Sequence, residues 1–145
     1  MKRFALGLSL FTLLLLNLSA VSQAQKTPDE SAVRAVVTDY IEAYYTGDGA
    51  RMERSLHPHY LKHTVFDSEG KVRMSETTGL QMVQDIRSGP ADLPASERIE
   101  QITVLDVAGD IASAKLVTAH WTDYLTLSKW NGEWKIVSVL LREND

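Results

Sequence analysis

Apolar residues recur at helical spacing after Thr27 and at strand spacing after about residue 99. Thr27, Pro28 and Glu30 form a helix start, with a capping threonine, a proline at the first helical position and a glutamate that completes a capping box. Gly47 is the expected end of this helix. Its predicted apolar face consists of Val33, Val36, Val37, Tyr40, Ile41 and Tyr44.

Two further helices and one hairpin are expected in the middle of the chain. His57-Pro58 ends the first of these helices, because a residue before proline leaves the helical region. The second carries the apolar residues Leu80, Val83 and Ile86. The predicted elements are a helix at 50–56, strands at 59–66 and 71–74, a helix from Thr77 or Thr78 to Gly89-Pro90, and a linker at 91–97.

The remainder of the chain alternates in the manner of an antiparallel meander. Asn131-Gly132 and Gly109-Asp110 are two-residue hairpin turns, and Asn-Gly is the strongest short signal of that kind. Helices segregated from an antiparallel sheet define the α+β class. The predicted strands are 99–107, 111–120, 124–130 and 133–141.

The two hairpin turns also predict which strand residues share a face of the sheet. The face covered by the helices should carry Leu105, Ala114, Leu116, Leu125, Leu127, Trp134 and Ile136. The opposite, convex face should carry Trp130, Val137, Val139 and Leu141, an apolar patch of the kind that marks an interface. We therefore expect a homodimer through these four residues.

Polar residues on the covered face are the candidates for chemistry. If Trp121-Thr122 is the connecting turn, His120 lies opposite Asp123, and the carboxylate would orient the imidazole as an acid–base pair. The alternative is a solvated structural pair at the end of the sheet. Tyr40 and Tyr44 either line a pocket with their hydroxyls or are core aromatics. The ligand-binding candidates are Tyr40, Tyr44, Thr118, Trp134 and Ser138.

The first residues have the pattern of an export signal. Lys2 and Arg3 precede an uncharged apolar run, and Ser22-Gln23-Ala24 supplies the small residues of a cleavage site. We expect a signal peptide at 1–24, and a periplasmic or extracellular protein with no membrane span after cleavage. The run is shorter than the roughly 20 residues that cross a bilayer, although an uncleaved anchor is the alternative.

Charge and cysteine content exclude several classes. The net charge is −4, and all 19 acidic residues follow the predicted leader, so no basic footprint for nucleic acid is present. The chain has no cysteine, which excludes disulfides, thiol nucleophiles and cysteine-ligated zinc. His59 and His63 on one strand would lie about 13 Å apart, too far to share a metal. We expect no metal and no cofactor.

Three stretches of the chain carry a family resemblance. They are residues 29–58, ending in Met-Glu-Arg-Ser-Leu-His-Pro; residues 104–115, with Gly-Asp-Ile-Ala-Ser-Ala; and residues 123–127 with 131–137. Together they resemble the nuclear-transport-factor-2-like (NTF2-like) superfamily and, within it, the "Putative lumazine-binding" family. The resemblance implies one NTF2-like domain at 25–145, a curved sheet wrapped around helices as a cone, an internal pocket and often a dimer.

Three functions remain open from the sequence. The first is an exported protein that binds a small organic molecule in the apolar cone. The second is a cofactor-free acid–base enzyme of the same fold, such as an isomerase, cyclase or dehydratase. The third is a non-catalytic interaction module that acts through the convex face. A fold of this kind hosts all three, so the site has to decide between them.

Overall fold

The computed structural model describes residues 27–144, so the predicted signal peptide at 1–24 lies outside the described residues. Within them, no helix has both the length and the apolar character needed to cross a membrane. The elements are α1 (Pro28–Thr46), α2 (Gly49–Ser55), β1 (Leu56–Ser68), β2 (Lys71–Thr78), α3 (Gly79–Arg87), the 3-10 helix η1 (Ala95–Glu97), β3 (Gln101–Ala108), β4 (Ile111–Val117), β5 (Trp121–Trp130) and β6 (Glu133–Glu143).

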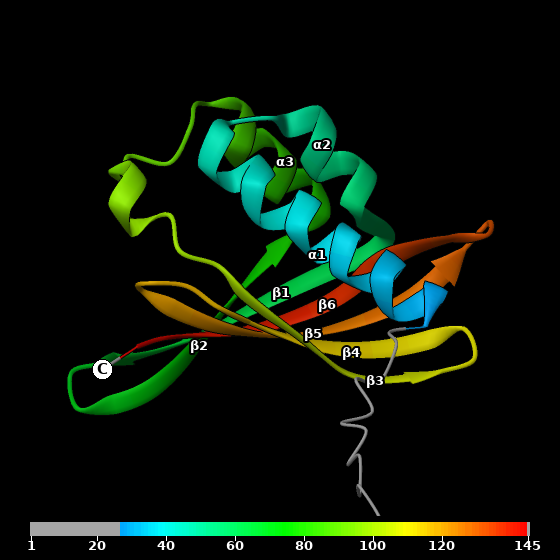
Figure 1. The fold of residues 1–145 in the computed structure, drawn as a ribbon. Coiled ribbons are helices and arrows are strands. Elements are labelled where there is room, and N and C mark those ends of the chain that lie inside the picture. Colours follow the sequence, from blue (N-terminus) through cyan, green and yellow to red (C-terminus); the bar gives the residue numbers. More distant parts are fainter. Residues whose placement is uncertain (1–26, 145) are drawn as a thin grey trace, which may run out of the picture.

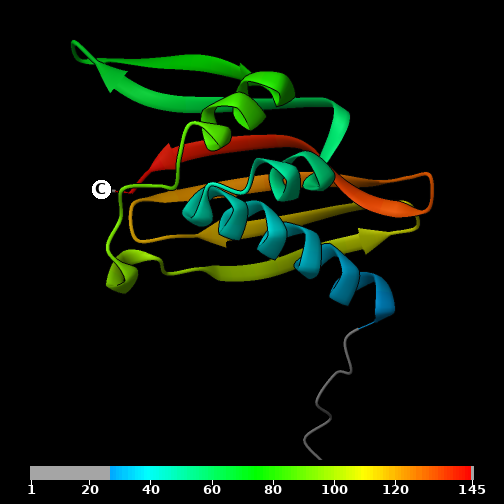
Figure 2. The same cartoon turned by 90° about the horizontal axis from the view of Figure 1, so that it is seen from above.

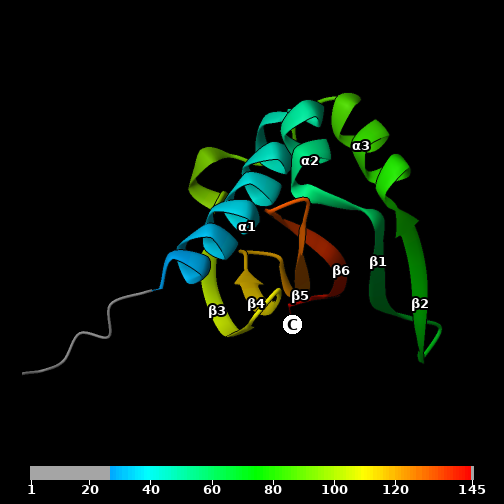
Figure 3. The same cartoon turned by 90° about the vertical axis from the view of Figure 1, so that its right-hand side faces the viewer.

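The three α-helices lie on one face of a curved six-stranded sheet (Figures 1 and 3). The strand order is β2-β1-β6-β5-β4-β3, and every neighbouring pair is antiparallel except β1 and β6, which run parallel. The predicted α+β class and cone architecture are confirmed. The sheet is mixed, because β1 of the early β1–β2 hairpin pairs in parallel with β6, the last strand of the meander. From above, α1 runs across the sheet with α2 and α3 towards the β1–β2 side (Figure 2).

The first helix follows its predicted boundaries. Thr27 accepts the backbone N–H of Glu30, and the Glu30 side chain accepts the backbone N–H of Thr27, which completes the capping box. Gly47 ends the helix in the left-handed conformation, at φ 74°. In α3 the three predicted apolar residues do not share one face. The buried residues are Met82, Val83 and Ile86, and Leu80 is exposed because it lies in the first turn on the outer side.

A bulge in the β3–β4 pair changes the predicted face of one residue. Val107 pairs with Ala112 as the turn predicts, but the register shifts between Val104 and Asp106. Val104, and not Leu105, therefore lies opposite Ala114. Because the bulge inserts one extra residue, Leu105 turns to the outer face, where it is half exposed. The prediction that Leu105 faces the helices is wrong.

A second bulge, in β6, corrects the predicted dimer patch. Leu127 pairs with Ile136 as expected, but Thr126 then pairs with Ser138, so Val137 is the extra residue. Every side chain beyond it changes face. Val139 and Leu141 are buried under the helices, at 1% and 7% exposure. A surface made of Trp130, Val137, Val139 and Leu141 does not exist in this fold.

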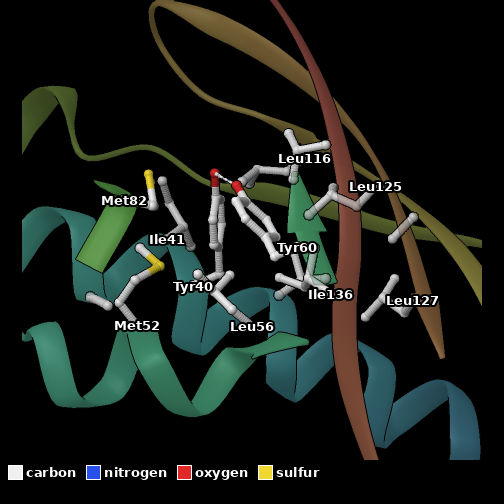
Figure 4. Close-up of a cluster of buried hydrophobic side chains, with 14 of the residues drawn as sticks. Tyr40, Ile41, Met52, Leu56, Tyr60, Met82, Leu116, Leu125, Leu127 and Ile136 are labelled. Carbon is white, nitrogen blue, oxygen red and sulfur yellow. Dashed lines mark hydrogen bonds between the residues drawn. The ribbon is translucent and has the colours of Figure 1, made fainter. Parts of the chain in front are cut away.

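The core lies between α1 and the inner face of β4, β5 and β6. Beneath the helices, Ile41 and Met52 pack with Leu116, Leu125, Leu127 and Ile136 (Figure 4). The side chains of Tyr40 and Tyr60 lie in the same layer, with their hydroxyls facing each other. At full burial, each large aliphatic side chain contributes about 1.5–3 kcal/mol of apolar transfer free energy.

Candidate functional site

A hollow opens between the C-terminal half of α1 and the sheet. Its inner part, the inner hollow, has a volume of about 80 Å³ and is lined by Tyr40, Ile41, Tyr44, Lys62, Met82, Trp121 and Leu141. Its outer part, the vestibule, has a volume of about 670 Å³. The vestibule is lined by Tyr44, Lys62, Thr64, Leu93, Ala119, His120, Trp121, Leu141, Glu143 and Asn144. The two parts share Tyr44, Lys62, Trp121 and Leu141, which makes them one continuous site.

Asp123 is the buried charge beside this hollow. Its position on β5 opposite Leu116 turns its side chain inward, and its exposure is 0%. Oδ2 accepts a hydrogen bond of 3.1 Å from Nε1 of Trp121, whereas Oδ1 is buried without a partner among the described residues. Burial raises the pKa of the Asp123 carboxyl to about 6, although Lys62 and the Trp121 hydrogen bond oppose the rise.

Two tyrosine hydroxyls meet beside the inner hollow, which Tyr40 lines. The hydroxyl oxygens of Tyr40, on α1, and Tyr60, on β1, lie 3.4 Å apart (Figure 4). Burial raises the pKa of Tyr40 well above its usual range and also holds the pKa of Tyr60 high, with the charge of Asp123 adding to both shifts. Both phenols therefore stay neutral at physiological pH and act as hydrogen-bonding groups.

Lys62 supplies a positive charge to the wall that the inner hollow and the vestibule share. It follows Tyr60 by two residues on β1, so both side chains point to the helix-covered face. Within residues 27–144, its ammonium group makes no hydrogen bond and no ion pair within 4 Å. Burial lowers the pKa of Lys62, and the negative charge of Asp123 works against that shift.

An aromatic pair forms the opposite wall. The rings of Tyr44, on α1, and Trp121, on β5, meet edge to face with centroids 5.3 Å apart. The hydrogen bond from Trp121 to Asp123 fixes the orientation of the indole. This arrangement gives the hollow an aromatic surface close to the Asp123 carboxylate, the Lys62 ammonium group and the Tyr40 hydroxyl. Such a mixture is typical of sites for small organic molecules.

The predicted pairing of His120 with Asp123 is wrong. The β4–β5 turn falls at residues 118–120, because Val117 pairs with Thr122 and Leu116 with Asp123. Trp121 is thus the first residue of a strand and not part of a turn. His120 is exposed at the rim of the vestibule, and its Nε2 lies 2.8 Å from Oε2 of Glu97. The two catalytic candidates have different partners, so they do not form an acid–base pair.

The five ligand-binding candidates separate into two groups. Tyr40 and Tyr44 line the inner hollow. Thr118 is buried in the β4–β5 turn, where its hydroxyl donates to the carbonyl of Trp121 and accepts backbone N–H groups. Trp134 donates to Asp29 at the start of α1, about 22 Å along the helix from Tyr44. Ser138 lies on the outer face and bonds Thr126, which follows from the bulge at Val137.

The histidines of residues 57–63 do not converge. Nδ1 of His57 accepts the backbone N–H of His59, and His63 lies 3.3 Å from Glu76 on β2. In the part of the chain that the structure describes, no three histidine, aspartate or glutamate side chains are grouped to hold a metal ion.

Lys62 and Trp121, which line the site, and Tyr60, which contacts the Tyr40 hydroxyl, are residues that the sequence analysis missed. The alternation of Tyr60, Lys62 and Thr64 was a usable signal, because a buried tyrosine places the lysine two residues later on the same inner face. No comparable signal exists for Trp121. Its place depends on where the β4–β5 turn closes, and Thr118-Ala119-His120 carries no glycine or asparagine to mark that turn.

Solved structures share this fold at low sequence identity. An NTF-2 like protein of unknown function from Silicibacter pomeroyi DSS-3 has a TM-score of 0.61 and 21% identity, covering 82% of this chain and 100% of that chain. An NTF2-like protein of unknown function from Shewanella baltica OS155 has a TM-score of 0.62 and 19% identity, covering 83% and 99%. A ketosteroid isomerase-like protein from Erwinia carotovora atroseptica SCRI1043 has a TM-score of 0.59 and 11% identity, covering 83% and 99%.

At this level of identity these likenesses define the fold and carry no residue role. No curated protein matches the chain. The family model described as "Putative lumazine-binding" matches residues 28–141, which is nearly all of the region that the structure describes. The chain therefore belongs to the "Putative lumazine-binding" family of NTF2-like proteins.

Proposed function

We propose that this protein is an exported binder of a small organic molecule, which it holds in the hollow between α1 and the sheet. One observation carries the proposal: the vestibule of about 670 Å³ continues into an inner hollow bordered by aromatic, hydroxyl and amino groups. That volume lies within the range of roughly 300–1,000 Å³ of ligand pockets. The leader pattern at residues 1–24 supports export.

Binding requires an apolar surface and polar groups that fix orientation, and both are present. Tyr44 and Trp121 supply the surface, while Lys62 and Tyr40, whose hydroxyl meets that of Tyr60, supply polar contacts. The family description suggests lumazine, a planar heterocycle, as the first compound to test. The acid–base enzyme is not proposed, because its supporting pair, His120 and Asp123, is not formed.

A fluorescence titration tests the binding site. Trp121 lines the hollow, whereas Trp134 lies near the start of α1. We expect lumazine to quench the fluorescence of Trp121 or to accept energy from it. If lumazine gives no signal, the neutral dye N-phenylnaphthylamine should do so. Trp121→Phe should abolish that signal, and the matched Trp134→Phe should keep it. A signal that survives Trp121→Phe and disappears in Trp134→Phe would place binding elsewhere, and no signal with either compound would contradict a binding role.

We further propose that the protein forms a homodimer through the outer face of the sheet. This face has a hollow of about 530 Å³, whose walls include Met74, Leu105, Tyr124 and Leu140 from β2, β3, β5 and β6. All four side chains are exposed. Contiguous apolar surface of this kind usually marks an interface, and a second copy provides a matching apolar surface with two-fold symmetry.

Sedimentation equilibrium of a charge variant tests the dimer. Leu140→Asp places a carboxylate in the centre of the outer face, and we expect it to shift the protein from dimer to monomer at micromolar concentration. Leu80→Asp is the matched control, because it places the same charge at another exposed leucine, which lies on α3 and not on the sheet. Leu80 is 68% exposed and Leu140 is 46% exposed. The control should remain dimeric. A monomeric parent protein, or equal effects of the two substitutions, would contradict an interface on this face.

A further inference from the structure

We propose that Lys62 holds an anionic oxygen group of the ligand, so that the natural ligand is an amphipathic organic anion. The apolar end of such a ligand would enter the inner hollow, its flat body would lie against Tyr44 and Trp121, and its anionic group would meet the Lys62 ammonium. This inference rests on the proposed binding function and specifies the ligand class.

The first argument is the position of Lys62. A lysine on the inner face of β1 is unusual, because its neighbours on that face include the buried Tyr60 and the inner wall residue Leu141. Lysines are almost never enclosed unless paired. Here the side chain borders both the inner hollow and the vestibule, which makes it the one charged side chain of residues 27–144 that lines both parts of the site.

The second argument is the lack of a neutralising partner. Three other lysines of the described region are engaged: Lys129 pairs with Asp29, Lys135 pairs with Glu133, and Lys115 lies over the ring of Tyr124. The remaining one, Lys71, is exposed to solvent at the start of β2 and borders neither part of the site. Lys62 has no such partner within residues 27–144. Asp123 influences it through space but lies beyond ion-pair distance, and one oxygen of Asp123 is held by Trp121. A desolvated cation without a partner gains most from an anionic ligand.

The third argument is the apolar lining around this charge. Ile41, Met82 and Leu141 border the inner hollow, whose volume of about 80 Å³ suits a few carbon atoms and not a large polar head. Of the acidic groups on the vestibule side, Glu97 is engaged by His120, and Glu143 lies in the exposed end of β6. The site thus combines one cation, an aromatic wall and a small apolar end. It selects ligands that are charged at one point only.

Two dyes that differ by one charge test this inference. Anilinonaphthalene sulfonate and N-phenylnaphthylamine share the same aromatic frame, and only the first carries an anionic group. Their affinities would be measured on the full-length protein, on Lys62→Met, on Lys62→Arg and on Lys115→Met. Lys115 is the matched control, because its side chain lies over Tyr124 on the outer face and its loss changes the net charge by the same amount.

We expect the parent protein to bind the sulfonate more tightly than the neutral dye. Lys62→Met should weaken sulfonate binding roughly tenfold, the size of one lost hydrogen bond to a charged group. The neutral dye should be unaffected, Lys62→Arg should retain most of the sulfonate affinity, and Lys115→Met should change neither. Thermal melts of each variant would confirm that it folds.

The inference is overturned if Lys62→Met leaves sulfonate binding unchanged, or if it weakens both dyes equally. It is also overturned if Lys115→Met has the same effect as Lys62→Met, because the anion would then be held by the general charge or by the outer face. Failure of the proposed function gives a different result. In that case neither dye binds, or a bulky Ala119→Trp at the rim of the vestibule leaves both affinities unchanged.

Discussion

Asp123→Asn should stabilise the protein at pH 7 by up to about 3 kcal/mol and should bring no gain at pH 4. The carboxyl of Asp123 is fully buried, and burial raises its pKa from 3.8 to about 6. Each pKa unit is equivalent to about 1.4 kcal/mol. At pH 7 the native protein therefore carries an ionised group that its surroundings disfavour, and asparagine removes that cost while it can still accept the indole N–H of Trp121.

The direction of the pH dependence follows from proton binding. Between about pH 4 and pH 6 the folded protein keeps the Asp123 proton and the unfolded chain has lost it, so this group makes stability fall as pH rises through that window. Below pH 4 both states are protonated, and parent and variant should unfold at the same urea concentration. Above pH 6 the full difference should be present.

Urea unfolding at pH 4 and pH 7 measures this effect, with the exposed Asp106→Asn as the control for loss of one surface carboxylate. The control should change stability by well under 1 kcal/mol. A gain for Asp123→Asn that is equal at the two pH values, or a loss at pH 7, would show that the carboxylate does not carry a desolvation cost. The expected gain would mean that the chain retains an unfavourable charge beside its hollow, a pattern typical of functional sites.

Gly47→Ala should destabilise the protein by roughly 3 kcal/mol. Gly47 ends α1 at φ 74°, a conformation that costs a side-chain-bearing residue about 1 kcal/mol. A Cβ there would also lie 2.7 Å from the backbone nitrogen of Pro90 and 2.9 Å from the carbonyl carbon of Gly89. Because these are backbone atoms, the loop after α3 would have to move, and overpacking of this kind adds about 1–3 kcal/mol.

Gly70→Ala separates the two causes. Gly70 has nearly the same φ, 72°, but a Cβ at that position would meet nothing within 4 Å. We expect it to cost only the conformational term, about 1 kcal/mol. The difference between the two variants in chemical denaturation then measures the close approach of α1 to residues 89–90. Equal losses would mean that this contact contributes nothing to stability.

Turn and cap signals predicted much of the fold because they act locally. The capping box of Thr27 and Glu30, the end of α1 at Gly47 and the Asn131-Gly132 hairpin depend on neighbouring residues, and each is present as expected. The site was predicted less well. Tyr40 and Tyr44 followed from helical spacing, whereas Ser138 was placed by extrapolating the β6 register past the bulge at Val137. Thr118 and Trp134 are buried as predicted, but neither lines the hollow.

Bulges are difficult to predict from sequence because one extra residue costs little locally and gains its stability from distant packing. At Val137 it brings Val139 and Leu141 under the helices, where their burial outweighs the loss of one ladder position. The same change of face removes the predicted dimer patch and exposes Leu140. The outer face that results combines residues from β2, β3, β5 and β6, which no single stretch of sequence contains.

The sequence by itself determined the helices, the hairpin turns, the α+β class and the family resemblance, because these depend on short-range spacing and on local backbone preferences. Only the tertiary structure decided the site. It separated His120 from Asp123, placed Trp121 against Tyr44, and brought Lys62 from β1 towards Asp123 on β5. The physical reason is that a site is assembled by packing between elements far apart in the chain, and one residue of register shift changes which side chains meet.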